Sequence, residues 1–189
     1  MDAPDTDPGW RFSWRSLLFL VPGYLRIGLW RSHDRDGLTT TREVWMSFVG
    51  ALLLFGVVIL LVIPGTEVSS PGPAVVALIA VSAGCLFAED RALARPLSCG
   101  DLAGLAASYR TRYFLAIALS EAIALFAFVA TFVTGQWWLY WVFLPVALFG
   151  FMRLAPTRAH LELAQEQLRL QGCSLSLVRA LRQMPPPRK

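Results

Sequence analysis

Residues 113–152 read YFLAIALSEAIALFAFVATFVTGQWWLYWVFLPVALFGFM, and they decide the fold class. They hold two apolar runs, 113–133 and 137–152, separated by the short turn 134–136. A helix needs about 20 apolar residues to cross a hydrocarbon core about 30 Å thick. Both runs are continuously apolar rather than alternating, which favours membrane-spanning helices over barrel strands. The second run is short, and we expect it to lengthen inward because Arg153 can extend its charge toward the membrane surface.

Two further apolar runs precede this pair, at 44–64 and 72–88. Apolar residues make up 56% of the 189 residues and charged residues 16%, against roughly 45–50% and 25% in soluble domains. A soluble domain of this size has too little interior for that balance. The sequence therefore predicts an all-α fold, a four-helix transmembrane bundle made of two helical hairpins. Small residues in the second run, Ala77, Ala80 and Gly84, are expected to let a neighbouring helix approach closely.

The basic residues predict the orientation of the chain. Residues 1–43 hold six Arg, the loop 89–112 holds four, and 153–189 hold six Arg and one Lys, whereas the loop 65–71 and the turn 134–136 hold none. All 17 basic residues therefore lie on one side of a four-span arrangement. Cytoplasmic loops carry the excess of Lys and Arg. We expect a multi-pass protein of the cytoplasmic membrane with both termini in the cytoplasm, whose basic segments contact anionic lipid headgroups.

Three regions follow from these boundaries: an interfacial segment 1–43, a transmembrane domain 44–152 and a cytoplasmic helical tail 153–189. The first region contains apolar residues at helical spacing, namely Trp10, Trp14, Leu17, Leu18 and Val21, with Arg11 and Arg15 beside them. This pattern predicts an amphipathic helix in the headgroup layer. It serves either as a membrane-surface anchor or as a docking helix for another subunit.

The loop 89–112 is expected to be structured. Ser98 and Asp101 resemble a capping box. The apolar residues that follow continue one helical face into the third span, so we expect one helix to start in the loop and run into the membrane.

The tail carries leucines at a period of seven: Leu154, Leu161, Leu168 and Leu175. The other seam positions are too polar for a good coiled coil. Pro156 is expected to separate the tail from the fourth span, Gly172 to break the tail helix before a second helix from Ser174, and residues 184–189 to be disordered. The helix packs either on its own protein or the membrane surface, or it binds a partner or a second copy.

Glu121 is the one ionisable residue well inside the predicted spans. A charge at the bilayer centre costs about 3 kcal/mol on insertion scales, so this carboxyl should face protein. Ser82 and Ser120 are the polar residues expected at a similar depth. Three interpretations stay open: a neutral Glu121 that donates to Ser82 or to the carbonyl of Trp141, a proton or ion site, and a pair with a cation of a partner subunit.

The remaining chemistry-bearing residues give no enzyme signature. His33 and His160 lie outside the spans, and the sequence has no P-loop and no dinucleotide-binding glycine motif. Cys85, Cys99 and Cys173 are odd in number and far apart, so neither a disulfide framework nor a metal site is expected. We expect no cofactor and no nucleic-acid partner, because the basic residues lie along the membrane face.

Two stretches carry a resemblance to a family: TGQWWLY at 134–140 and ALFGFMRLAPTR at 147–158. They resemble small four-span membrane proteins of high-GC Gram-positive (actinobacterial) bacteria. The resemblance implies topology and membrane localisation, and no assigned function comes with it.

The function expected from the sequence is that of a non-enzymatic accessory or scaffold subunit of a membrane assembly. Its partners would be the bilayer and either another membrane protein or further copies of the chain. The alternative is a proton- or ion-coupled carrier component that uses Glu121.

Overall fold

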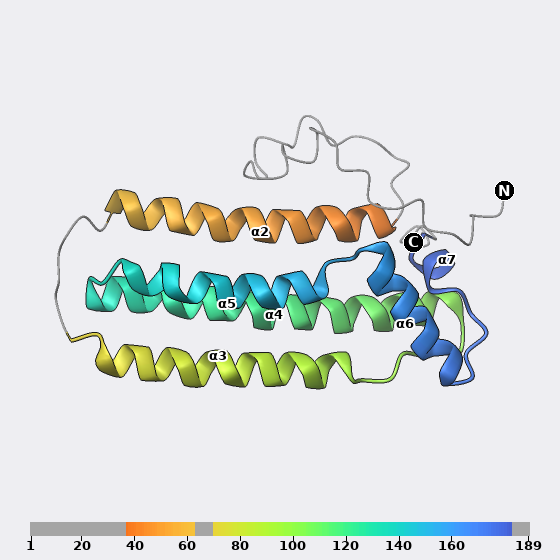
Figure 1. Cartoon of the computed structure of the whole chain (residues 1–189). Helices are drawn as coiled ribbons and strands as arrows, with labels where there is room; N and C mark the ends of the chain where they lie inside the picture. The colour runs from red at the N-terminus through yellow and green to blue at the C-terminus, as the bar shows by residue number, and fades with distance from the viewer. Residues whose placement is uncertain (1–36, 63–69, 183–189) are drawn as a thin grey trace, which may run out of the picture. The chain divides into compact units, whose positions relative to one another are not determined.

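The computed structural model describes residues 37–62 and 70–182. Every helix or strand assigned in these ranges is an α-helix (Figure 1). The predicted all-α class is therefore confirmed for the described part of the chain. The amphipathic helix predicted within 1–43 and the tail end 184–189 lie outside the described residues, as does most of the loop 65–71.

Six helices follow one another along the chain: α2 (Gly37–Val62), α3 (Gly72–Leu93), α4 (Leu102–Thr134), α5 (Trp138–Leu154), α6 (Arg158–Leu170) and α7 (Leu177–Arg182). Three of them, α2, α3 and α4, are long and apolar enough to cross a membrane. The count reaches four only if α5 and α6 are taken together as one broken span. Three to four apolar helices are consistent with a multi-pass membrane protein.

The described residues divide into two compact units. The first, which we call the apolar unit, comprises 48–62, 70–94 and 114–154. The second, which we call the loop-and-tail unit, comprises 37–47, 95–113 and 155–182. Each unit has its own internal contacts and is described by itself.

Segments of four helices contact one another in the apolar unit. The ring of Phe128 in α4 lies 5.1 Å from that of Phe55 in α2 and 6.3 Å from that of Tyr140 in α5. The hydroxyl of Tyr140 donates to the backbone carbonyl of Leu52. In the most apolar 18-residue stretch of α4, 39% of the residues are buried, against 22% in the corresponding stretches of α2 and α3. The helix α4 is therefore the best covered of the three, and α2 and α3 keep broad uncovered faces.

The small residues of α3 are not used to pack against the described chain. Ala77 and Ala80 are exposed, and a Cβ added at Gly84 would meet no atom within 4 Å. The expected close approach of a neighbouring helix at these residues is thus absent within the described residues. The side of α3 that contacts its neighbours carries Leu78, Ser82, Glu89 and Ala92 instead.

The helix α4 runs without a break from the loop into the third predicted span, as the sequence pattern predicts. Its cap differs from the predicted capping box. The Asp101 carboxylate accepts a hydrogen bond from the backbone N–H of Gly104 at 2.8 Å, which makes Asp101 the capping residue. Ser98 lies further back in the loop, where its own N–H donates to the Ser108 hydroxyl at 3.1 Å. Asp101 is one residue from the first helical turn and Ser98 is too far away to cap it.

The tail forms two helices, as the positions of Pro156 and Gly172 predict. Thr157 caps α6 by accepting from the N–H of His160 at 3.3 Å. Gly172 ends the helical path with a φ of +80°, a conformation that favours glycine. Leu161 and Leu168 are buried on one side of α6, whereas Leu163 and Leu170 are exposed. One face of α6 therefore packs within its own unit and the other remains uncovered.

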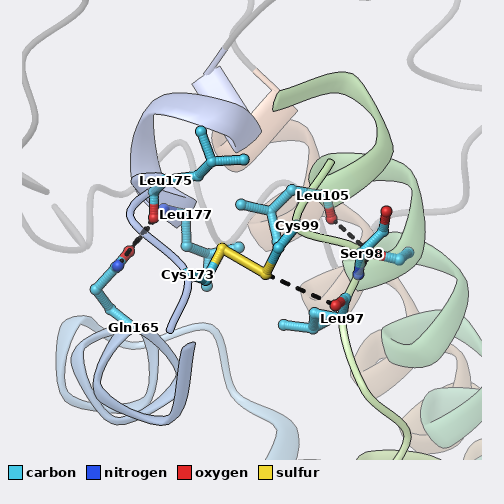
Figure 2. Close-up of a disulfide and its surroundings, with 9 residues drawn as sticks. Leu97, Ser98, Cys99, Leu105, Gln165, Cys173, Leu175 and Leu177 are labelled. Atoms are coloured by element: carbon cyan, nitrogen blue, oxygen red, sulfur yellow. Dashed lines mark hydrogen bonds between the residues drawn. A yellow bond between two sulfur atoms is a disulfide. The ribbon is translucent and has the colours of Figure 1, made fainter. Parts of the chain in front are cut away.

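The largest departure from expectation in the loop-and-tail unit is a disulfide between Cys99 and Cys173 (Figure 2). The prediction that the cysteines form no disulfide is wrong for this pair. The two residues are 74 positions apart, yet their Cα atoms lie 5.8 Å from each other, within the range that a disulfide requires. Cys99 lies in the loop before α4, and Cys173 lies directly after α6. The folding of this unit therefore brings together two cysteines that are far apart in the sequence. Cys85 is free.

The Asp101 cap gives a direct test. We expect Asp101→Ala to lower the stability of the loop-and-tail unit by about 1 kcal/mol, because the N–H of Gly104 loses its acceptor. Asp101→Asn should retain most of that stability, since the amide oxygen can accept the same bond. Ser98→Ala is the control and should have little effect, because the Ser98 bond uses its backbone N–H. Thermal unfolding of the detergent-solubilised protein would check this, and equal losses from Asp101→Ala and Ser98→Ala would contradict the assignment.

Candidate functional site

A buried carboxylate stands out among the polar groups of the apolar unit. Glu89 belongs to α3, and its side chain is 0% exposed. Its Oε2 atom accepts a hydrogen bond from the Ser120 hydroxyl of α4 at 2.7 Å. A buried carboxylate without partners is very costly in an apolar surrounding. The contact with Ser120 is therefore one that the packing of these helices depends on.

Arg153 of α5 supplies the countercharge. Its Nη1 lies 3.8 Å from the Oε1 of Glu89, and its Nη2 donates to the Oδ1 of Asp90. The Arg153 side chain is 35% exposed and that of Asp90 is 56% exposed, so this guanidinium bridges a buried and an exposed carboxylate. The sequence predicts that Arg153 extends toward the membrane surface. The structure gives it two acidic partners on α3 as well.

Gly150 of α5 provides the space in which the carboxylate and the hydroxyl meet. A Cβ at this position would lie 3.0 Å from the Oε2 of Glu89 and would clash with the Oγ of Ser120. Glycine is therefore required by close approach and not by backbone conformation. We call Glu89, Asp90, Ser120, Gly150 and Arg153 the Glu89 cluster. It joins α3, α4 and α5 within the apolar unit.

One oxygen of the cluster has no hydrogen-bond donor. The Oε1 of Glu89 is buried, and among the described residues its only charged contact is the 3.8 Å pair with Arg153. A carboxyl can carry a proton at such an atom, and protonation removes the cost of the buried charge. The cluster can therefore act as a structural ion pair, or it can hold and release a proton.

The three site residues predicted from the sequence, Ser82, Ser120 and Glu121, have different surroundings in the structure. Ser120 is fully buried and belongs to the cluster. Glu121 is half-buried and has no hydrogen-bond or ion-pair partner among the described residues, so neither predicted bond, to Ser82 or to the carbonyl of Trp141, is present. Ser82 is buried, and its hydroxyl has no partner in the described part of the chain. The structure thus brings Ser120 to an acid other than the neighbouring Glu121.

The sequence predicts Glu89 at the start of the loop 89–112, because the apolar run 72–88 ends before it and a charged residue usually marks the end of a span. A signal was nevertheless available in the sequence. Glu89 follows Ser82 by seven residues, or about two helical turns, so both lie on one face if the helix continues. Since α3 extends to Leu93, that face carries Glu89 inward.

No three histidine, cysteine, aspartate or glutamate side chains gather as possible metal ligands in residues 37–62 and 70–182. Comparison of the chain with models of protein families, with curated proteins and with solved structures finds no match.

The space at Gly150 can be tested with two matched substitutions. Gly150→Ala should destabilise the protein by about 1–3 kcal/mol, because the added methyl group must displace Ser120 or Glu89. Gly84→Ala, also within a helix, should be neutral or stabilise by up to about 1 kcal/mol, because the new methyl group meets open space and alanine favours the helix. Thermal unfolding in detergent compares the two. Similar behaviour of both variants would argue against the close packing at Gly150.

The ion pair calls for a double-mutant cycle. Arg153→Ala should destabilise by about 1–3 kcal/mol, a figure reduced from that of a fully buried pair because the guanidinium is partly exposed. The same substitution in a Glu89→Gln background should cost much less, since the buried charge is gone and the amide can still accept from Ser120. Glu121→Gln is the control background, in which Arg153→Ala should keep its full effect. Additive effects of Glu89→Gln and Arg153→Ala would show that the pair contributes nothing.

Proposed function

We propose that this chain is a non-enzymatic accessory or scaffold subunit of a membrane assembly. In this proposal the apolar helices form a four-helix bundle of two hairpins in the cytoplasmic membrane, and both termini lie in the cytoplasm. The orientation is supported by the 17 basic residues, all of which flank one side of the four predicted spans. The arginines of the tail would contact anionic lipid headgroups.

The observation that carries the proposal is the asymmetry of α3. One side of this helix is fixed in the apolar unit by the Glu89 cluster. The opposite side exposes Ala77 and Ala80, and Gly84 stands in open space. Helices associate in lipid through small residues, because these let two backbones approach closely. The uncovered face therefore suits a helix from another membrane protein or from a second copy of this chain.

The broader surface is compatible with such a role. Large apolar side chains are exposed along α2, α3 and α4, among them Leu60, Leu61, Val76, Ile79, Val129 and Val133. A bilayer covers such surfaces without specific contacts. The small-residue face of α3 differs from them in shape, which is why we place the partner there and lipid elsewhere.

A second candidate is a proton- or ion-coupled carrier component, and one observation favours it. Ser120 donates to the buried Glu89, and the next residue in the chain is Glu121. Ser120 therefore adjoins two acidic residues, Glu121 in the sequence and Glu89 in space. The helices that carry them, α3 and α4, are long and apolar enough to span a membrane. Acidic residues within spans commonly mark ion or proton pathways. In this alternative Glu121 and Glu89 would exchange protons through rearrangement around Ser120.

The test is gentle detergent extraction of the full-length protein at native expression, followed by mass determination of the intact particle. We expect a particle heavier than one chain that contains a second protein or further copies in fixed ratio. Gly84→Leu should lower the recovery of that particle several-fold, because the larger side chain blocks close approach. Val57→Leu on the exposed face of α2 is the matched control and should leave recovery unchanged.

A monomeric particle without a stoichiometric partner would contradict the scaffold proposal. Proton flux into vesicles that contain the purified protein would then decide the alternative. Flux that is lost in both Glu89→Gln and Glu121→Gln would support the carrier, and absence of flux in the unmodified protein would exclude it.

A further inference from the structure

In the proposed orientation the disulfide of the loop-and-tail unit lies in the cytoplasm, where disulfides are unusual. Cys99 and Cys173 both belong to segments that the basic residues place in the cytoplasm. Cytoplasmic thiols are kept reduced, and disulfides there are usually transient and tied to catalysis or redox sensing. A purely structural bond is therefore a poor explanation for a pair held at a Cα distance of 5.8 Å.

We propose that Cys99 and Cys173 form a reversible thiol–disulfide exchange site whose co-substrate is a low-molecular-weight thiol of the cytoplasm. This inference rests on the orientation given under the proposed function, and not on the scaffold role. The site is distinct from the Glu89 cluster, which belongs to the apolar unit.

The two sulfur atoms differ in access, and this sets the order of the exchange. Cys99 is exposed, whereas Cys173 is only 5% exposed. The thiolate of the small thiol attacks the Sγ of Cys99, the Cys99–Cys173 bond breaks, and Cys173 leaves as a thiolate that takes up a proton. The thiolate of a second small thiol attacks the outer sulfur of the mixed disulfide, which belongs to the first small thiol, and Cys99 leaves as a thiolate that takes up a proton. The products are two cysteine thiols and the oxidised small disulfide, so two electrons pass from the small thiol to the protein pair, and oxidation runs the same steps in reverse.

The surroundings of Cys173 allow this cycle. Cys173 lines an open groove of about 500 Å³ beside α6, together with Arg158, Arg169, Glu162 and Glu166. Ion pairs join the charges along the helix, from Arg158 to Glu162 and from Arg169 to Glu166. Their side chains are all more than half exposed, so this side of the groove is solvated and charged. The groove is also lined by Leu161, Leu175 and Val178, so Cys173 lies among both apolar and charged side chains, and a thiolate released there has access to water through the groove.

Reduction would release the loop without unfolding the tail. The N–H of Cys173 donates to the carbonyl of Leu168 at 3.0 Å, which closes the end of α6. The Gln165 side chain donates to the Leu175 carbonyl at 3.0 Å and accepts from the Leu177 N–H at 2.6 Å (Figure 2). None of these bonds depends on the disulfide, so we expect them to hold the segment after α6 in place when the disulfide is reduced. The disulfide adds the covalent tie from this segment to the loop before α4.

The experiment uses full-length protein carrying Cys85→Ser, so that Cys99 and Cys173 are its only thiols. Cells are quenched with acid, and free thiols are labelled with a maleimide polymer that shifts the electrophoretic mobility. We expect both cysteines to be free in unstressed cells and both to be blocked after brief treatment with diamide, with recovery on its removal. In membranes equilibrated with mixtures of reduced and oxidised glutathione, the oxidised fraction should follow the mixture. Cys99→Ser and Cys173→Ser should each abolish formation of the intramolecular bond.

A second readout reports the structural consequence. Limited proteolysis of membrane vesicles should cut the reduced protein several-fold faster between residues 95 and 101 than the oxidised protein. The Cys99→Ser/Cys173→Ser double variant is the control and should be insensitive to the redox mixture.

Three results would overturn the inference: a pair that stays oxidised in unstressed cells and resists glutathione, a pair that never oxidises, and labelling by a membrane-impermeant maleimide from the external side. Since none of these measurements depends on a partner, their failure and that of the scaffold role can be told apart.

Discussion

The apolar unit depends on the cost of a buried carboxylate. Glu89 is fully enclosed, and the groups that compensate its charge come from two other helices, the Ser120 hydroxyl of α4 and the Arg153 guanidinium of α5. Each of these partners constrains the helix that carries it, because hydrogen bonds and ion pairs are directional where apolar contacts are not. Gly150 then fixes how closely α5 can approach. Glu89, Ser120, Gly150 and Arg153 therefore fix how α3, α4 and α5 are aligned with one another at this point. Hydrophobic packing alone does not fix that alignment.

Hydropathy predicts the helices well, because the thickness of a bilayer imposes a length on each apolar run. The predicted spans 72–88 and 113–133 lie within α3 and α4, whose actual ends extend beyond them. The ends are less predictable, since a charged residue can close a span or lie on the inner face of a helix that continues. Glu89 is the second case, and the helical periodicity from Ser82 is the evidence that a search by apolar runs overlooks.

The other differences have a common origin in contacts that are not local. The spacing of Cys99 and Cys173 says nothing about the turn after α6, which brings them together. The sequence indicates Glu121 by its predicted depth, but depth does not determine which side of a helix faces its neighbours. Ser120, one position away, lies on the buried face and Glu121 is only half-buried. In contrast, the sequence predicts Asp101 as part of the cap of this helix, close to its observed role as the capping residue, because helix capping is decided within a few residues.

The order of the helices has a consequence for how this protein is made. Glu89 belongs to α3, which leaves the ribosome before α4 and α5. Until α5 has been synthesised Arg153 is absent, so the Glu89 carboxyl has to remain hydrated or take up a proton. The ion pair of Glu89 with Arg153 can form only after α5 has been made. The packing of α3 is thus completed by a residue near the end of α5, and a chain interrupted before Arg153 would leave Glu89 without the guanidinium that pairs with it.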